Sequence, residues 1–255
     1  MGLEGLFYLP SIMAESLIWF LASWATGAAG VGLARSLALR QGWLDLPNER
    51  SFHTNPTPRI GGFGFLAPVV LGLLALWVWP GRDPGSGAVL WLAPCFLVAF
   101  LSFLDDRFNI PRILRFGVHA VCAVLVLWLF REVWMEQPLP LVGLLPVTAA
   151  AVLLFLWIAG LTNAYNFMDG IDGIAAIQGL VALGGWFLFL ALEPGLGDPG
   201  IRGALPVLLL LAGGLAGFLL LNWSPGRIFR GDVGSTFLGC FLAVGALGWW
   251  GRRMG

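Results

Sequence analysis

Apolar runs of membrane-spanning length recur along the whole chain of 255 residues. An α-helix needs roughly 17–25 predominantly apolar residues to cross a bilayer. Composition agrees, because only 11% of the residues are charged, against about 25% in soluble domains. A transmembrane β-barrel would instead show alternating segments of about ten residues. The sequence therefore predicts an all-α fold, a polytopic transmembrane helical bundle.

We expect about eight spans. They cover approximately residues 12–34, 60–79, 88–104, 113–131, 139–161, 173–192, 203–221 and 234–250. Three connections, 80–87, 132–138 and 193–202, are short and rich in Pro and Gly or carry a few charges, which is typical of plain turns. The other connections carry the polar motifs, and they alternate with the plain ones along the chain. The motifs are therefore expected on one face of the membrane.

The arginines predict which face this is. Nine lie on the side of the motifs: Arg35, Arg40, Arg50, Arg59, Arg107, Arg112, Arg115, Arg227 and Arg230. Three lie in the opposite loops, Arg82, Arg131 and Arg202, and Arg252 and Arg253 follow the last span. Basic residues concentrate in cytoplasmic loops, so we expect the motif loops in the cytoplasm and the N-terminus outside. The net charge of zero gives no reason to expect a nucleic-acid partner.

Asp105 and Asp106 directly follow the apolar run 98–104. On a helix such neighbours point about 100° apart, so one carboxylate can face a cavity while the other flanks it. Mg²⁺ or a diphosphate–Mg²⁺ complex would stabilise both in the charged form. The alternative is an ordinary helix end at the interface, although the helix dipole disfavours acidic groups at a C-terminus. A one-sided cluster of ionisable groups in a membrane protein indicates a site.

The stretch NAYNFMDGIDGIAA, residues 163–176, places Asn163, Asn166, Asp169 and Asp172 at three-residue spacing. On a continuous helix these groups would sweep about half the circumference, and an interrupted helix would align them more closely. The glycines beside both aspartates permit such a break. The mixture of amides and carboxylates suits a sugar nucleotide or a metal-bound diphosphate. A calcium loop is excluded because its other ligand positions are missing.

Two further motifs are expected to face phosphate. Asp232 lies between glycines in GDVGS, residues 231–235, where it can reach a metal while Ser235 caps the next helix. In the loop before the second span, Arg59 can grip phosphate and His53 can bind phosphate or shuttle a proton. His119 lies inside a span and is interpreted as a packed core residue, as are the three cysteines, which lie singly in apolar runs.

These motifs, taken together and in order, resemble the polyprenyl-phosphate N-acetylhexosamine-1-phosphate transferase family, glycosyltransferase family 4. They are DLPN at 45–48 with HTNPTPRIGG at 53–62, FLDDRFNI at 103–110, NAYNFMDGIDGIAA at 163–176 and IFRGDVGSTFLG at 228–239. The resemblance covers about residues 40–240. The wording YNFMDGIDG is closer to the branch that initiates O-antigen and related surface glycans. The alternative branch is phospho-N-acetylmuramoyl-pentapeptide transferase.

The resemblance implies a reaction in which a polyprenyl (undecaprenyl) phosphate attacks the β-phosphorus of a UDP-amino sugar and UMP leaves. The product would be the first intermediate of a cell-envelope polysaccharide such as lipopolysaccharide. Direct attack is favoured over a covalent intermediate. The implied cofactor is Mg²⁺, with Mn²⁺ as a substitute. The implied setting is the inner membrane with the site at its cytoplasmic face, and family members can form homodimers.

The resemblance also implies roles for individual residues. Asp232 matches the leading metal ligand, with Asp169 as a further one. Asp105 and Asp106 match the pair that deprotonates the lipid phosphate or assists metal binding. The implied catalytic residues are Asp105, Asp106, Asp169 and Asp172, and the implied substrate-binding residues are His53, Arg59, Asn163 and Asn166.

One departure from the family concerns the C-terminal end. Family members usually continue past the GDVGS span with further helices and a late loop rich in His and Arg. We therefore expect residues 1–255 to form a single integral membrane transferase domain that lacks those helices. Either His53 and Arg59 take over the work of that loop, or the chain is an inactive remnant. A polytopic transporter is the alternative from another class, and it predicts polar groups near mid-membrane.

Overall fold

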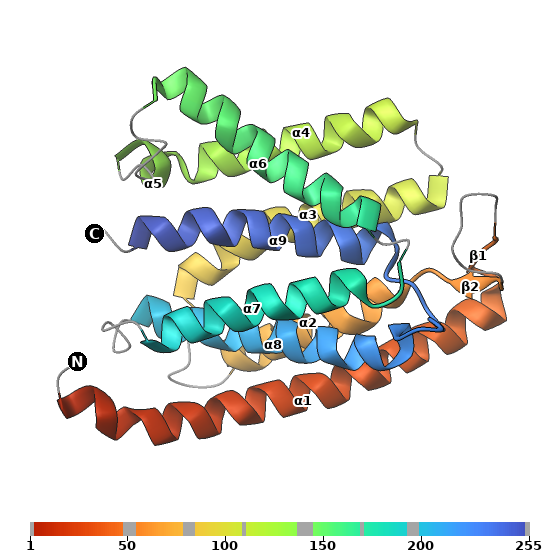
Figure 1. The fold of residues 1–255 in the computed structure, drawn as a ribbon, viewed down its shortest axis with the longest axis horizontal. Helices are drawn as coiled ribbons and strands as arrows, with labels where there is room; N and C mark the ends of the chain where they lie inside the picture. The colour runs from red at the N-terminus through yellow and green to blue at the C-terminus, as the bar shows by residue number, and fades with distance from the viewer. Residues whose placement is uncertain are drawn as a thin grey trace. The chain divides into compact units, whose positions relative to one another are not determined.

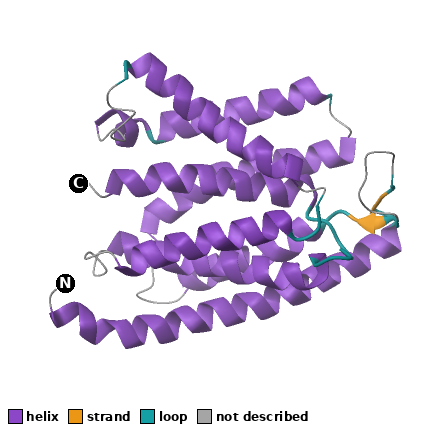
Figure 2. Cartoon of the chain, viewed as in Figure 1, coloured by secondary structure: helices purple, strands orange, loops and turns teal. Residues whose placement is uncertain are grey.

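The structure is a computed structural model, and it describes residues 3–47, 55–78, 85–108, 111–136, 145–168, 171–192 and 199–252. Helices form nearly all of the described chain (Figures 1 and 2). The chain divides into two compact units. Unit 1 comprises Met1–Val89 and Gly170–Gly231, and unit 2 comprises Leu90–Asp169 and Asp232–Gly255.

Unit 1 is built around the long helix α1. Its elements are α1 (Leu3–Gln41), β1 (Leu44–Asp45), β2 (Thr57–Pro58), α2 (Gly61–Val78), α7 (Ile174–Leu192) and α8 (Pro199–Asn222). α1 packs along α8 and α2, and α7 packs on α8 (Figure 1). A Cβ on Gly27 would lie 2.7 Å from the Cα of Gly214. Small residues therefore let these backbones approach closely, as is common between membrane helices.

Unit 2 is organised around α9. Its elements are α3 (Gly85–Phe108, which begins in unit 1), α4 (Arg112–Leu129), α5 (Arg131–Glu136), α6 (Val147–Phe167) and α9 (Gly231–Arg252). Every residue from 231 to 245 is buried. The rings of Phe96 in α3 and Phe237 in α9 lie 5.0 Å apart, and the Trp157 indole N–H in α6 donates to the Ala243 carbonyl at 3.2 Å.

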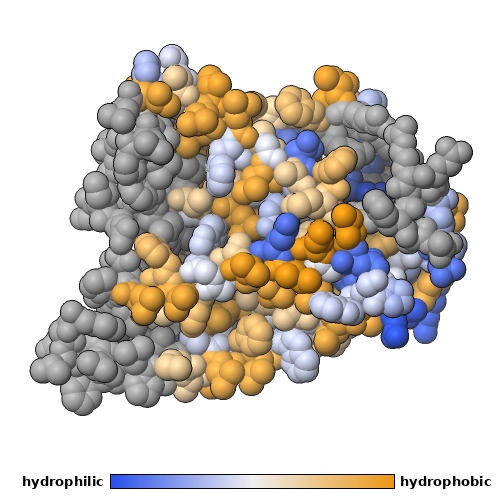
Figure 3. Space-filling view, in the orientation of Figure 1, coloured by the Kyte–Doolittle hydropathy of each residue, from blue (hydrophilic) through white to orange (hydrophobic). Residues whose placement is uncertain are grey.

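The predicted helical membrane fold is confirmed. Five helical segments among the described residues are long and apolar enough to cross a membrane: Met13–Gln41, Gly61–Val78, Val147–Phe167, Ile174–Leu192 and Ala204–Asn222. The other three expected spans correspond to shorter apolar helical segments, Leu92–Asp105, Phe116–Leu129 and Gly231–Ala246. Large apolar side chains such as Trp77 and Trp128 are exposed on the two units, and apolar patches cover part of the face in Figure 3. Such a surface suits a lipid environment.

Several predicted boundaries were wrong. α1 continues to Gln41, so Arg35 and Arg40 lie on the helix and not in a loop. Arginine is a good helix former, and a positive charge near a helix C-terminus is favoured by the dipole, so these charges did not end the helix. α6 continues to Phe167, and the connection 132–138, expected as a plain turn, contains the short helix α5. A two-residue antiparallel pairing of β1 with β2 is the one strand pairing among the described residues.

Candidate active site

The site end of unit 2 is a buried polar layer. Asp105 near the end of α3 and Asp232 in the first turn of α9 are each only 3% exposed. Three hydroxyl residues within four positions of these aspartates are also buried: Ser102, Ser235 and Thr236. Burying ionised carboxylates in a membrane protein is unfavourable, so they are retained mainly where they bind or react. Both predicted carboxylates are therefore buried, as is expected of groups that bind or react.

A chain of hydroxyl groups connects α3 to the main chain at Asp232. The Thr236 hydroxyl donates to the Asp232 carbonyl at 2.7 Å. Ser102 Oγ lies 2.9 Å from Thr236 Oγ1. A hydroxyl has one proton to donate, and Thr236 uses its proton on Asp232, so Ser102 is the donor in this second bond. These bonds hold the start of α9 against α3. Ser102 is three residues before Asp105, and Thr236 is four residues after Asp232, so the contact lies near both aspartates.

A second set of contacts fixes α6 against α9. The Ser235 hydroxyl donates to Asn166 Oδ1 at 2.7 Å, and the Asp232 carbonyl lies 3.2 Å from the same hydroxyl. One turn further along α9, a Cβ on Gly239 would lie 2.8 Å from the Cα of Thr162. Together with the Trp157–Ala243 bond, these pairs show α6 and α9 running antiparallel. Asn166 therefore lies opposite the start of α9, the helix that carries Asp232.

We expect Thr236→Val to lower the free energy of unfolding by about 1–3 kcal/mol. The change removes the hydrogen-bond partner of the buried Ser102 hydroxyl and one partner of the Asp232 carbonyl. Adding Ser102→Ala removes the stranded donor, so the double variant should lose less than the sum of the single losses. The measurement is the unfolding midpoint in detergent. The control is Thr26→Val on the exposed side of α1, whose hydroxyl bonds only carbonyls of its own helix. Strictly additive losses would contradict the hydroxyl chain.

The site end of unit 1 is organised by the loop 223–230. The Phe229 N–H donates to the Pro58 carbonyl, and the Gly61 N–H donates to the Phe229 carbonyl, both at 2.8 Å. The Gly62 N–H donates to the Arg230 carbonyl, also at 2.8 Å. These bonds attach the loop to the start of α2 and to the segment that carries Arg59. Arg59 is half-buried there.

The motif 163–176 is divided by a break, which the glycines permit. α6 ends at Phe167, and Gly173, just before α7, has a φ of 71°, a left-handed conformation that favours glycine. Asp172 therefore lies in a turn and not on a continuous helix with Asn163 and Asn166. Its Oδ2 accepts the Gly226 N–H at 2.8 Å. This carboxylate belongs to unit 1, whereas the two asparagines belong to unit 2.

The remaining predicted residues have different outcomes. His53 and Asp169 lie outside the described residues. Asp106 lies in α3, Asn163 is exposed on α6, and His119 is buried as predicted. The prediction that Ser235 caps α9 was wrong. The helix already begins at Gly231, so Ser235 lies within it and bonds across to α6.

Sequence reasoning missed two residues. Arg230 was counted only as a marker of orientation, yet it is 1% exposed and is the largest fully buried side chain among the described residues. A buried guanidinium next to the Gly231–Asp232 pair is expected to have a specific role. Its sequence signal was its place directly before GDVGS. Asn222 was interpreted as the start of a loop, yet it is buried and bonds two separate segments.

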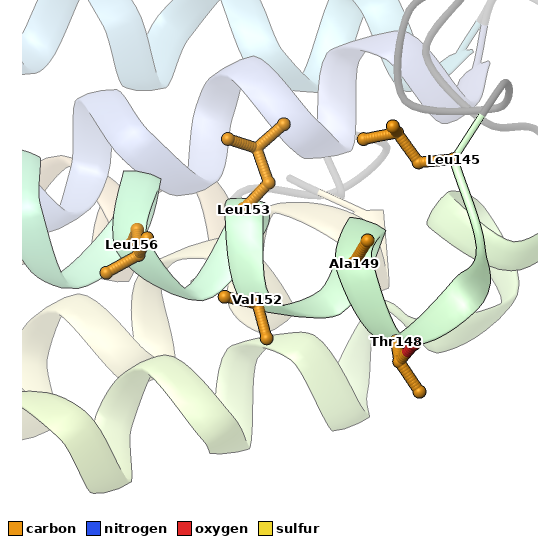
Figure 4. A pocket seen from close by; sticks show the side chains of 6 residues that line it. All are labelled: Leu145, Thr148, Ala149, Val152, Leu153 and Leu156. Carbon is orange, nitrogen blue, oxygen red and sulfur yellow. The ribbon is translucent and has the colours of Figure 1, made fainter.

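A surface pocket of unit 2 lies away from these polar groups. Six residues line it: Leu145, Thr148, Ala149, Val152, Leu153 and Leu156 (Figure 4). All but the first lie in the N-terminal half of α6, whereas Asn163 and Asn166 lie near its C-terminus. The pocket is nearly all apolar and therefore offers no chemistry for a phosphate.

Fold and site together define a multi-pass helical membrane protein with buried carboxylates at helix ends. The model of the glycosyl transferase family 4 matches residues 88–249. The chain belongs to this family.

Three relatives illustrate the similarity. A probable undecaprenyl-phosphate N-acetylglucosaminyl 1-phosphate transferase of Bacillus subtilis is 27% identical over 92% of this chain and 63% of its own length. A decaprenyl-phosphate N-acetylglucosaminephosphotransferase of Mycobacterium leprae is 32% identical over 86% of the chain and 56% of its own length. A phospho-N-acetylmuramoyl-pentapeptide-transferase of Latilactobacillus sakei is 31% identical over 74% and 61%. The chain thus spans under two thirds of the length of these relatives.

The family assignment made from the motifs is confirmed. The finer assignment to the O-antigen branch stays a prediction, because the relatives include enzymes named for different sugars. Homodimer formation also stays a prediction.

Proposed function

We propose that this protein transfers N-acetylhexosamine 1-phosphate from a UDP-amino sugar to a polyprenyl phosphate in the membrane. UMP is released and a polyprenyl diphosphate-sugar remains. The observation that carries the proposal is the pair of buried carboxylates, Asp105 and Asp232, in a member of this family. The printed names of the B. subtilis and M. leprae relatives support N-acetylglucosamine as the first sugar to test.

The reaction joins two anions, so positioning and charge neutralisation supply most of the catalysis. An oxygen of the lipid phosphate forms a bond to the β-phosphorus, and the bond from that phosphorus to the oxygen of UMP breaks. Asp105 is proposed to accept the proton of the lipid phosphate, and Asp106 to assist. Arg59 is proposed to bind substrate phosphate, together with His53, and Asp172 and Asn163 to position the UDP-sugar.

The donor groups of unit 2 fit Mg²⁺. They are oxygens on facing helices: the Asp232 carboxylate, and Asn166 Oδ1, which is directed toward the first turn of α9 by its contact with Ser235. No cluster of three or more His, Cys, Asp or Glu occurs among the residues that the structure describes. Mg²⁺ typically takes one or two carboxylates and completes its shell with water and substrate phosphate. We propose Asp232 as its main ligand, with Asp169 as a further one. Bound there, the ion would neutralise developing charge on the phosphates.

The proposed location is the inner membrane with the site at the cytoplasmic face. The arginine distribution supports this orientation. Within unit 2, the polar groups of α3, α6 and α9 gather at one end of those helices, as the bonds Ser102–Thr236 and Ser235–Asn166 require. A transporter would need polar groups along the path near mid-membrane, so this placement favours an enzyme.

The test is UMP release by the purified protein in detergent. UDP-N-acetylglucosamine and undecaprenyl phosphate are supplied with Mg²⁺, with Mn²⁺, or with a chelator. We expect UMP only when lipid and metal are both present. The panel includes UDP-N-acetylmuramoyl-pentapeptide, because one relative is named for that substrate. Turnover of that substrate alone would place the protein in the alternative branch, and silence with every UDP-amino sugar would contradict the proposal.

A further inference from the structure

We propose that Asn222 is a positioning residue that fixes the turn carrying Asp172 to the loop 223–230. This inference rests on the proposed function, because it gives Asn222 a role in placing Asp172 for the UDP-sugar. Asn222 is the last residue of α8 and is 5% exposed. Neither of its two functional atoms is directed at its own helix.

Both ends of the Asn222 carboxamide are used, and each bonds a different segment. Oδ1 accepts the N–H of Gly173 at 2.9 Å, the residue directly after Asp172. Nδ2 donates to the carbonyl of Ile228 at 2.9 Å, in the loop before α9. One side chain therefore connects main-chain groups that lie 55 residues apart in the sequence (228 minus 173). A buried amide with both ends satisfied is a rigid link, because losing either partner leaves a desolvated polar group.

A reciprocal bond runs the other way between the same two segments. Asp172 Oδ2 accepts the N–H of Gly226 at 2.8 Å. A Cβ at Gly226 would overlap the Asp172 carboxylate, with Cγ at only 2.9 Å. The Asp172 side chain thus bonds the main chain of the loop, and the side chain of Asn222, the residue directly before the loop, bonds the main chain of the turn. Such reciprocal pairs hold two segments in one register, in the way a capping box does at a helix start.

The end of α8 does not itself need Asn222. The Trp223 N–H bonds the Leu219 carbonyl and the Arg227 N–H bonds the Leu221 carbonyl, both at 2.8 Å. These main-chain bonds terminate the helix. The side chain of Asn222 is therefore free to act on Gly173 and Ile228. A residue that only capped its own helix would not reach either of them.

The consequence is a fixed position for a half-buried carboxylate. Asp172 is partly open to its surroundings, and one of its oxygens is held by Gly226. Among the hydrogen bonds of the described residues, Asn222→Ala leaves the one from Gly226 to Asp172 to join the turn 171–173 to the loop. Misplacing a substrate-contacting group by about 1 Å can lower turnover by roughly a hundredfold. Asn222→Ala is therefore expected to lower kcat/KM for the UDP-sugar by about 10- to 100-fold.

The experiment combines hydrogen exchange with kinetics. Asn222→Ala should speed amide exchange in 171–177 and in 223–230 while exchange in the rest of the chain is unchanged. Asn222→Asp keeps an acceptor for Gly173 but lacks the donor to Ile228, so it should speed exchange mainly in 223–230. The control is Ser36→Ala on α1, whose hydroxyl bonds only Gly32 of its own helix. It should match the wild type in both readouts.

A second arm separates positioning from general damage. In an Asp172→Asn background, adding Asn222→Ala should change UDP-sugar binding less than about threefold, because the residue acts through Asp172. An equal loss of binding in both backgrounds, unchanged exchange in Asn222→Ala, or unchanged kcat/KM would each overturn the proposal. Failure of the proposed function is a different result, since it shows as an inactive wild-type protein before any variant is compared.

Discussion

Asp232→Asn is expected to lower turnover by about a thousandfold or more while the protein keeps its helical fold. The change replaces one oxygen of a buried carboxylate by an NH2 group, which gives a neutral side chain of the same shape. A thousandfold loss corresponds to about 4 kcal/mol of transition-state stabilisation. Removal of a full charge from a desolvated site where phosphate reacts is expected to have an effect of that size.

The fold should survive because the hydroxyl contacts described for Asp232 are made to its main-chain carbonyl. Thr236 donates to the main-chain carbonyl of Asp232, and the Ser235 hydroxyl lies 3.2 Å from the same carbonyl. The substitution retains that carbonyl, so the first turn of α9 stays attached to α3 through Ser102. The variant should therefore match the wild type in its circular dichroism and unfolding midpoint. UMP release with saturating lipid and Mg²⁺ is the activity measurement.

Glu15→Gln is the matched control for Asp232→Asn. It is the same change from acid to amide, made on α1, where Glu15 Oε1 accepts the Trp19 indole N–H at 3.4 Å. The amide keeps an oxygen for that bond, and we expect turnover within about threefold of the wild type. A comparable loss in both variants would indicate general damage. An Asp232→Asn protein that retained more than about a tenth of wild-type turnover would remove Asp232 from the reaction.

Local pattern predicted the helices well, because a membrane span is specified by the length and polarity of one continuous run. The same reasoning allowed a break near Gly173 without deciding for it, and glycine tolerates the left-handed backbone found there. It misjudged the helix ends at Gln41 and Phe167. Charged and amide side chains can extend from a helix into a polar zone without ending it, so polarity alone does not mark a boundary.

The contacts of the site could not be predicted in the same way. Asn222 meets Gly173 across 49 positions, and Ser235 meets Asn166 across 69. Such pairs are set by how helices pack, which no local periodicity records. Arg230 shows the same limit. Its charge is evident from the sequence, but only packing shows that the side chain is buried.

Gly231→Ala is expected to prevent accumulation of the folded protein or to lower its stability by several kcal/mol. Gly231 has a φ of 70°, and a residue with a Cβ is strained there by about 1–2 kcal/mol. The new methyl group would also overlap the carbonyl oxygen of Arg59. That carbonyl has little room to move, because the main chain of Arg59 is held on both sides. Phe229 bonds Pro58, directly before Arg59, and Gly61, two residues after it.

Gly184→Ala on α7 is the control for this change, because a Cβ there meets nothing within 4 Å. Alanine favours helices over glycine by about 1 kcal/mol, so this variant should be as stable as the wild type or slightly more so. The measurements are the yield of monodisperse protein after size exclusion and the unfolding midpoint in detergent. Equal behaviour of the two alanine variants would show that the Arg59 segment can move. The loop 223–230 and the start of α9 would then not depend on a close main-chain approach at Gly231.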